Sequence, residues 1–124
     1  MQDYNKILSN IKKEEYSPFY LLSGNETYFI DSISSILVNK IVQEASKEFD
    51  FTKFYGQDTS ASEIIESARR FPMLSKYNLI IVREAQNMPT SEYDYLAKYV
   101  ASQTDVEIIS WKGICIVHDQ FNEN

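Results

Sequence analysis

The feature that most constrains the fold is the tetrapeptide Leu79-Ile80-Ile81-Val82, which is apolar at every position. A strand with one face in water alternates apolar and polar residues, whereas a strand with a helix on each face is apolar throughout. Residues 79–82 therefore predict a central strand of a parallel sheet that is covered by helices on both faces.

The rest of the chain alternates between strand-like runs and helical stripes. Strands are expected at residues 18–24, 49–55, 79–82, 106–109 and 114–117, and helices at residues 4–11, 26–46, 60–71 and 90–100. Ser60 and Glu63 have the spacing of a capping box, and Pro72 stops the helix that they open. Strands that alternate with helices imply right-handed crossovers. The expected fold is one α/β domain over residues 1–124, with a mostly parallel sheet in three layers.

Charge and composition exclude several classes of protein. The chain has 124 residues, 12 basic against 18 acidic, and a net charge of −6. A domain that holds nucleic acid by itself is usually basic, so we expect no strong direct nucleic-acid binding. No apolar run approaches the length of a membrane span, and residues 1–13 lack a signal peptide's apolar core. With the single cysteine Cys115, no intrachain disulfide is possible, and a cytoplasmic protein is expected.

The turn after the first strand is where a nucleotide would bind in such a fold. Residues 23–27 (SGNET) contain one glycine and no lysine, whereas a phosphate-binding loop needs several glycines, a lysine and then Ser or Thr. Arg83 follows the central strand at the place where an aspartate would hold magnesium. The nucleotide site is therefore interpreted as degenerate. The alternative is a degenerate nucleotide phosphotransferase that uses Glu84, which measured nucleotide affinity would distinguish.

Other candidates for catalysis are weak. His118 is the one histidine, and Cys115 lies in an apolar run typical of a core. No spacing of Cys and His suits a metal. The acid pairs Asp58/Glu63 and Glu92/Asp94 are typical of helix caps and solvated faces. We expect no catalytic residue, no cofactor and no metal.

Residues 69–78 (RRFPMLSKYN) are the more informative segment. Here a helix ends, and the apolar residues Met73 and Leu74 stand in a polar turn before the central strand. Two interpretations are open. Met73 and Leu74 either pack under the domain as core, or form an exposed apolar wedge for a protein partner, for which the adaptable methionine is suited.

Four ordered segments carry a family resemblance: residues 18–31 (PFYLLSGNETYFID), 54–56 (FYG), 68–75 (ARRFPMLS) and 79–85 (LIIVREA). In this order they resemble the first domain of the delta subunit of bacterial DNA polymerase III, over about residues 16–100. The resemblance implies an AAA+-like, P-loop-type domain that has lost its nucleotide site.

The resemblance also implies a function. Delta is the clamp-loader subunit that binds the ring-shaped beta sliding clamp and favours its open interface, while other subunits hydrolyse ATP. By resemblance, Met73 and Leu74 enter the clamp's hydrophobic pocket, with Phe71 and Pro72 beside them. The expected partners are the beta clamp and the other clamp-loader subunits, and the chain is not expected to be an enzyme by itself.

Two features depart from the family. Its members continue into lid and collar domains, so a fragment or an early end of the reading frame is expected here. Residues 110–118 (SWKGICIVH) do not resemble the family. The remaining alternative is a folded remnant without a retained partner.

Overall fold

The computed structural model describes residues 2–16, 19–23, 27–42, 44, 47–104 and 113–119. The helices in this part of the chain are α1 (Gln2–Lys12), α2 (Thr27–Ile41), α3 (Ala61–Arg69) and α4 (Thr90–Thr104). The strands are β1 (Phe19–Ser23), β2 (Phe51–Tyr55), β3 (Asn78–Arg83) and β4 (Gly113–Asp119). Two short 3-10 turns, η2 (Gly56–Asp58) and η3 (Ala85–Asn87), follow β2 and β3.

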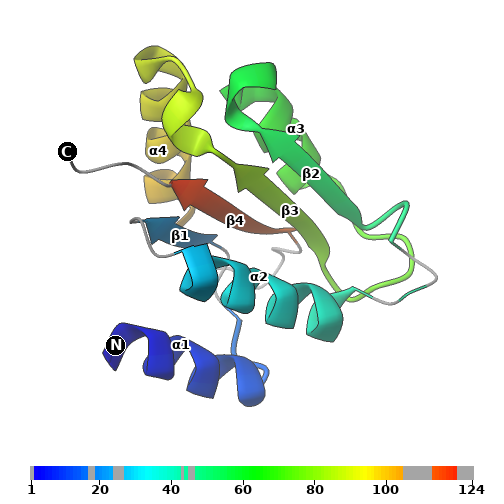
Figure 1. The fold of residues 1–124 in the computed structure, drawn as a ribbon. Coiled ribbons are helices and arrows are strands. Elements are labelled where there is room, and N and C mark those ends of the chain that lie inside the picture. Colours follow the sequence, from blue (N-terminus) through cyan, green and yellow to red (C-terminus); the bar gives the residue numbers. More distant parts are fainter. Residues whose placement is uncertain are drawn as a thin grey trace.

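The strands form one parallel sheet in the order β1-β4-β3-β2 (Figure 1). Phe51 of β2 lies opposite Leu79 of β3, and Ile80 lies opposite Cys115 of β4. The register of β2 against β3 places Asp50, which directly precedes β2, beside the start of β3. The predicted parallel sheet is confirmed.

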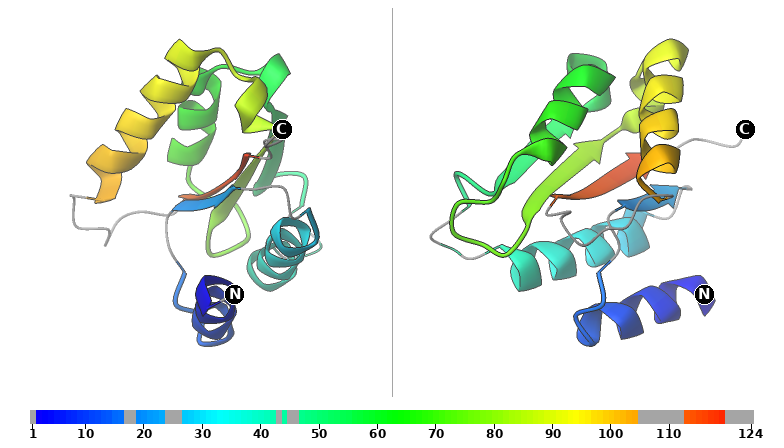
Figure 2. Two further views of the ribbon diagram at one scale, coloured as in Figure 1. Left: turned by 60° about the vertical axis from the view of Figure 1, so that its left-hand side comes forward. Right: turned by 180° about the vertical axis from the view of Figure 1, so that it is seen from behind.

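Helices cover both faces of the sheet, with α2 on one face and α3 and α4 on the other (Figures 1 and 2). The side chains of β3 alternate between the two cores: Leu79 and Ile81 pack in the cluster with α1 and α2, whereas Ile80 and Val82 pack with α3 and α4. All four side chains are at most 4% exposed. The prediction of a central strand at residues 79–82 is confirmed.

Some boundaries differ from the predicted ones. The helix expected over residues 26–46 ends at Ile41, because the stripe of apolar residues stops at Val42. Helix α3 ends at Arg69 rather than near Phe71, since Pro72 disfavours a helical conformation at the residue before it. The strand expected at residues 49–55 begins at Phe51. The expected strand at residues 114–117 is confirmed as β4, and the one at residues 106–109 lies outside the described residues.

The start of α3 follows the predicted capping pattern. The backbone N–H of Glu63 donates to the Ser60 side-chain oxygen at 3.2 Å. The Glu92 carboxylate accepts from the Ala61 amide at 3.2 Å. Glu92 therefore serves the helix start of α3, which supports the structural interpretation of that acid.

Gly56 is buried beneath the turn that follows β3, and a Cβ at this position would overlap the backbone carbonyl oxygen of Glu84. Glu84 already adopts a left-handed conformation, with φ 55° and ψ 45°. We expect Gly56→Ala to lower the free energy of unfolding by about 1–3 kcal/mol, because one backbone segment must move. Thermal unfolding measures this loss, with Gln57→Ala at an exposed position of the same turn as the control. Equal stability of both variants would contradict the prediction.

Candidate protein-binding surface

The connection between α3 and β3 carries an exposed cluster of apolar side chains. Phe71 is 79% exposed, Met73 is 69% exposed and Leu74 is 56% exposed, and Pro72 is half-buried. We call these four residues the apolar loop. The interpretation in which Met73 and Leu74 pack into the core is therefore wrong. Neighbouring large apolar side chains in water are typical of a surface that binds another protein.

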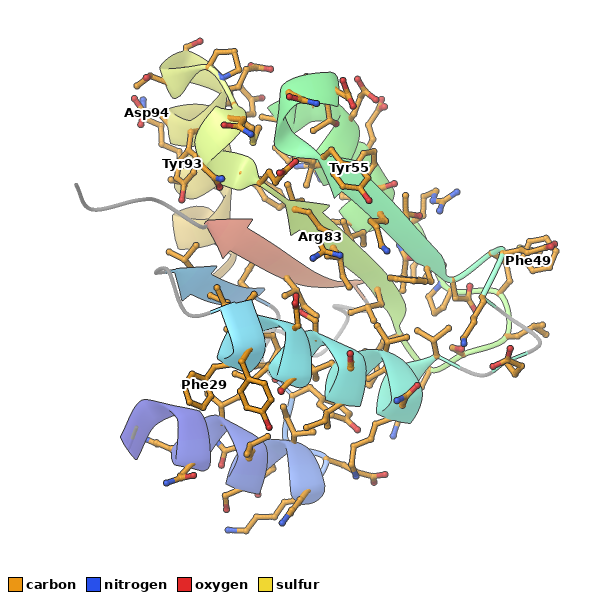
Figure 3. The ribbon with its side chains drawn as sticks, in the orientation of Figure 1. Phe29, Phe49, Tyr55, Arg83, Tyr93 and Asp94 are labelled. Carbon is orange, nitrogen blue, oxygen red and sulfur yellow. The ribbon has the colours of Figure 1, made fainter. Side chains whose placement is uncertain are left out.

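The apolar loop lies where β3 begins, at the amino-terminal edge of the sheet (Figure 1). In α/β folds with parallel sheets, nucleotides and similar ligands bind beyond the carboxyl ends of the strands. The loop is thus at the opposite edge from the place where a nucleotide would bind. Phe49, which is 48% exposed, also projects at this end of the molecule (Figure 3).

Asp50 holds the backbone of the apolar loop. Its side chain is fully buried just before β2. Oδ1 accepts a hydrogen bond from the Met73 amide at 2.6 Å, and Oδ2 accepts from the amides of Leu74 at 2.8 Å and Ser75 at 2.6 Å. One carboxylate thereby binds three consecutive backbone donors. The backbone of Met73 and Leu74 is tied to the domain while their side chains remain in solvent.

The hydrogen bonds determine the charge state of Asp50. Burial by itself would raise its pKa, but the amides of Ser75, Met73 and Leu74 and the nearby Arg70 guanidinium favour the carboxylate, so the pKa of Asp50 lies below its usual value. An acid with a lowered folded-state pKa stabilises the fold above its unfolded pKa of about 3.9. That stabilisation is lost as the pH falls through the folded-state pKa.

Asn78, the first residue of β3, holds the other side of the loop. Its side-chain amide donates to the carbonyl oxygens of Ser67 at 2.5 Å and Arg70 at 3.3 Å. Asn78 is 1% exposed. The end of α3 is therefore fixed by Asn78, and the residues after Pro72 are fixed by Asp50.

Sequence reasoning found the apolar residues of the loop but missed Asp50 and Asn78. The available signal was a polar residue directly before or at the start of each of two strands. It becomes informative only when β2 and β3 are known to be parallel neighbours, with Phe51 opposite Leu79.

An ion pair lies near the edge of the sheet where a nucleotide would bind in such a fold. Residues 24–26 lie outside the described residues. Arg83 ends β3 and points toward α2 (Figure 3), where its Nη2 lies 3.3 Å from Oδ1 of Asp31. Both side chains are partly exposed, and such pairs contribute little to stability. An open cavity of about 470 Å³ lies between α2 and β2–β3, with Asp31, Lys53 and Arg83 among its lining residues.

The side chains of Cys115 and His118 are outside the described part of the structure. Within the described ranges, no three His, Cys, Asp or Glu side chains gather as metal ligands would. Every helix in those ranges is too short or too polar to cross a membrane.

Comparison with known proteins agrees with the sequence resemblance. The family model described as "DNA polymerase III, delta subunit" matches residues 20–109, which is well over half of the chain. DNA polymerase III subunit delta of Bacillus subtilis is 29% identical over 77 residues, which cover 62% of this chain and 22% of that protein. A shorter match, 64% identical over 28 residues, is to quinolinate synthase 2 of Mesorhizobium japonicum and covers 23% of this chain and 9% of that protein.

The fold is similar to that of a solved clamp-loader protein. The Bacillus subtilis DNA clamp loader delta protein superposes with a TM-score of 0.79 at 20% identity, over 98% of this chain and 37% of that one. This chain thus spans less than half of either delta protein. Because the family model covers most of the sheet and the whole apolar loop, the chain belongs to the family of DNA polymerase III delta subunits.

Proposed function

We propose that this chain is the sliding-clamp-binding domain of a DNA polymerase III clamp loader and helps to open the beta clamp during DNA replication. The observation that carries the proposal is the apolar loop, whose Met73 and Leu74 are exposed on a backbone held by Asp50. Membership of the delta family supports the clamp as the partner. In the full-length subunit, the other partners are the remaining clamp-loader subunits.

The domain acts by binding rather than by catalysis. We propose that its architecture is the three-layer, AAA+-like first domain of the delta subunit, with a degenerate nucleotide site. The ion pair between Arg83 and Asp31 supports this, because a basic side chain ends β3 at the place where a nucleotide site would have a magnesium-binding acid. ATP is then hydrolysed by other subunits of the loader.

Clamp opening would follow from a difference in affinity. A ligand shifts a closed ring toward its open state only if it binds the open state more tightly. In this proposal, Met73 and Leu74 anchor the domain in an apolar pocket of the clamp, and Phe71 and Pro72 add contact area. The neighbouring surface of the domain then fits the open interface better than the closed one.

Calorimetry of the chain against the beta clamp of the same organism tests the proposal. We expect saturable binding with a negative heat-capacity change, because apolar surface leaves water. Absence of binding at high micromolar concentrations would contradict the proposal and favour a folded remnant without a partner. A clamp variant that cannot close its ring should bind more tightly than the closed ring. Equal affinities would rule out opening while retaining clamp binding.

A further inference from the structure

We propose that Asp50 is a positioning residue for clamp binding: its buried carboxylate holds the apolar loop in the conformation that presents Met73 and Leu74 to the partner. The inference rests on the proposed function of the loop. It assigns a role to a side chain that is itself fully buried and is therefore not expected to contact the clamp.

The geometry suits this role. Three consecutive amides, those of Met73, Leu74 and Ser75, donate to the two carboxylate oxygens over 2.6–2.8 Å. Hydrogen bonds to an ionised acceptor are stronger than neutral ones. Because these three donors are backbone amides, the side chains of Met73 and Leu74 remain available for contacts with a partner.

The position of Asp50 in the fold explains its reach. The Leu79 amide donates to the Asp50 backbone oxygen at 2.8 Å, so Asp50 is fixed to the start of β3 by its own backbone. Its carboxylate accepts hydrogen bonds from residues 73–75, which precede that strand. The loop is thereby anchored at the place where β2 and β3 begin side by side.

An ordered loop binds more tightly than a disordered one, because the entropy of ordering is not lost on binding. Without the carboxylate, the three amides would form hydrogen bonds with water, and the loop would sample other conformations. We therefore expect a weakening of clamp binding of roughly tenfold, the size of effect typical of losing preorganisation over a few residues.

Asp50→Asn in the 124-residue chain is the test. Asparagine has nearly the same shape, but its NH₂ group faces amide donors where a second acceptor is needed. We expect faster hydrogen exchange of the amides of Met73, Leu74 and Ser75 in the free chain, slow exchange retained in β3, and roughly tenfold weaker clamp binding by calorimetry. Leu96→Ala serves as the control, because it removes a buried side chain of α4 from the cluster that packs with α3. It should destabilise the fold but leave clamp affinity within about twofold.

The outcomes separate the two proposals. If the wild-type chain binds the clamp and Asp50→Asn binds equally well, the positioning role is wrong and the proposed function stands. Equal weakening of clamp binding by Asp50→Asn and by Leu96→Ala would also overturn the positioning role. If the wild type does not bind, the proposed function fails together with the inference. Should Asp50→Asn not fold, Asp50→Glu keeps the charge but displaces the oxygens, and the same two measurements decide.

Discussion

Replacing Met73 and Leu74 together by alanine should weaken clamp binding by at least about 100-fold and leave the fold intact. A large apolar side chain contributes about 1.5–3 kcal/mol when it is fully buried, and about 1.4 kcal/mol corresponds to tenfold in affinity. Both side chains are more than half exposed in the chain alone. Truncating such residues changes stability by only about 0.5 kcal/mol. Calorimetry measures the affinity, and circular dichroism with thermal unfolding measures the fold.

A matched surface variant controls for loss of any exposed apolar side chain. Tyr95 on α4 is 57% exposed, which is close to the 56% of Leu74, and α4 lies away from the loop (Figure 1). Tyr95→Ala should bind the clamp with wild-type affinity. Retained binding in the folded Met73→Ala/Leu74→Ala variant would show that the clamp contacts another surface. Equal weakening by Tyr95→Ala would show that the binding is not specific to the loop.

Much of the fold was predictable because its signals are local or nearly so. Four consecutive apolar residues at positions 79–82 identified the strand whose side chains enter both cores, and Ser60 and Glu63 identified the start of α3. The predicted end of α2, at residue 46, lies beyond its observed end at Ile41. Residues 43–48 carry no large apolar side chain, yet they also contain neither proline nor glycine to mark a stop.

The apolar part of the candidate site was predictable, but its support was not. Phe71, Met73 and Leu74 follow one another in the sequence, so a turn rich in apolar residues could be read directly. Asp50 lies more than 20 residues before the amides that it binds, and an isolated acid before a strand has no signature of its own. Whether Met73 and Leu74 were core or surface was likewise undecided, because exposure depends on how β2 and β3 pair.

Asn78→Asp should lower the free energy of unfolding by about 3–5 kcal/mol at pH 7, the cost typical of a buried charge without a partner. The new carboxylate would face the carbonyl oxygens of Ser67 and Arg70, to which the Asn78 amide now donates at 2.5 and 3.3 Å. Burial and the two carbonyl groups would raise its folded-state pKa above the unfolded value of about 3.9. For an acid with a raised pKa, the destabilisation is complete above the folded-state pKa and disappears below the unfolded one.

The difference in stability between wild type and Asn78→Asp should therefore shrink as the pH falls from 7 to about 4. The contribution of Asp50 has the opposite pH dependence, but it is present in both proteins and cancels in the difference. Asn78→Leu is the control: it removes the same two hydrogen bonds to Ser67 and Arg70 but adds no charge, so its smaller loss, about 1–3 kcal/mol, should not depend on pH. Urea unfolding at several pH values measures both. A pH-independent loss in Asn78→Asp would mean that the carboxylate reaches water, and that Asn78 does not hold the end of α3 in a buried site.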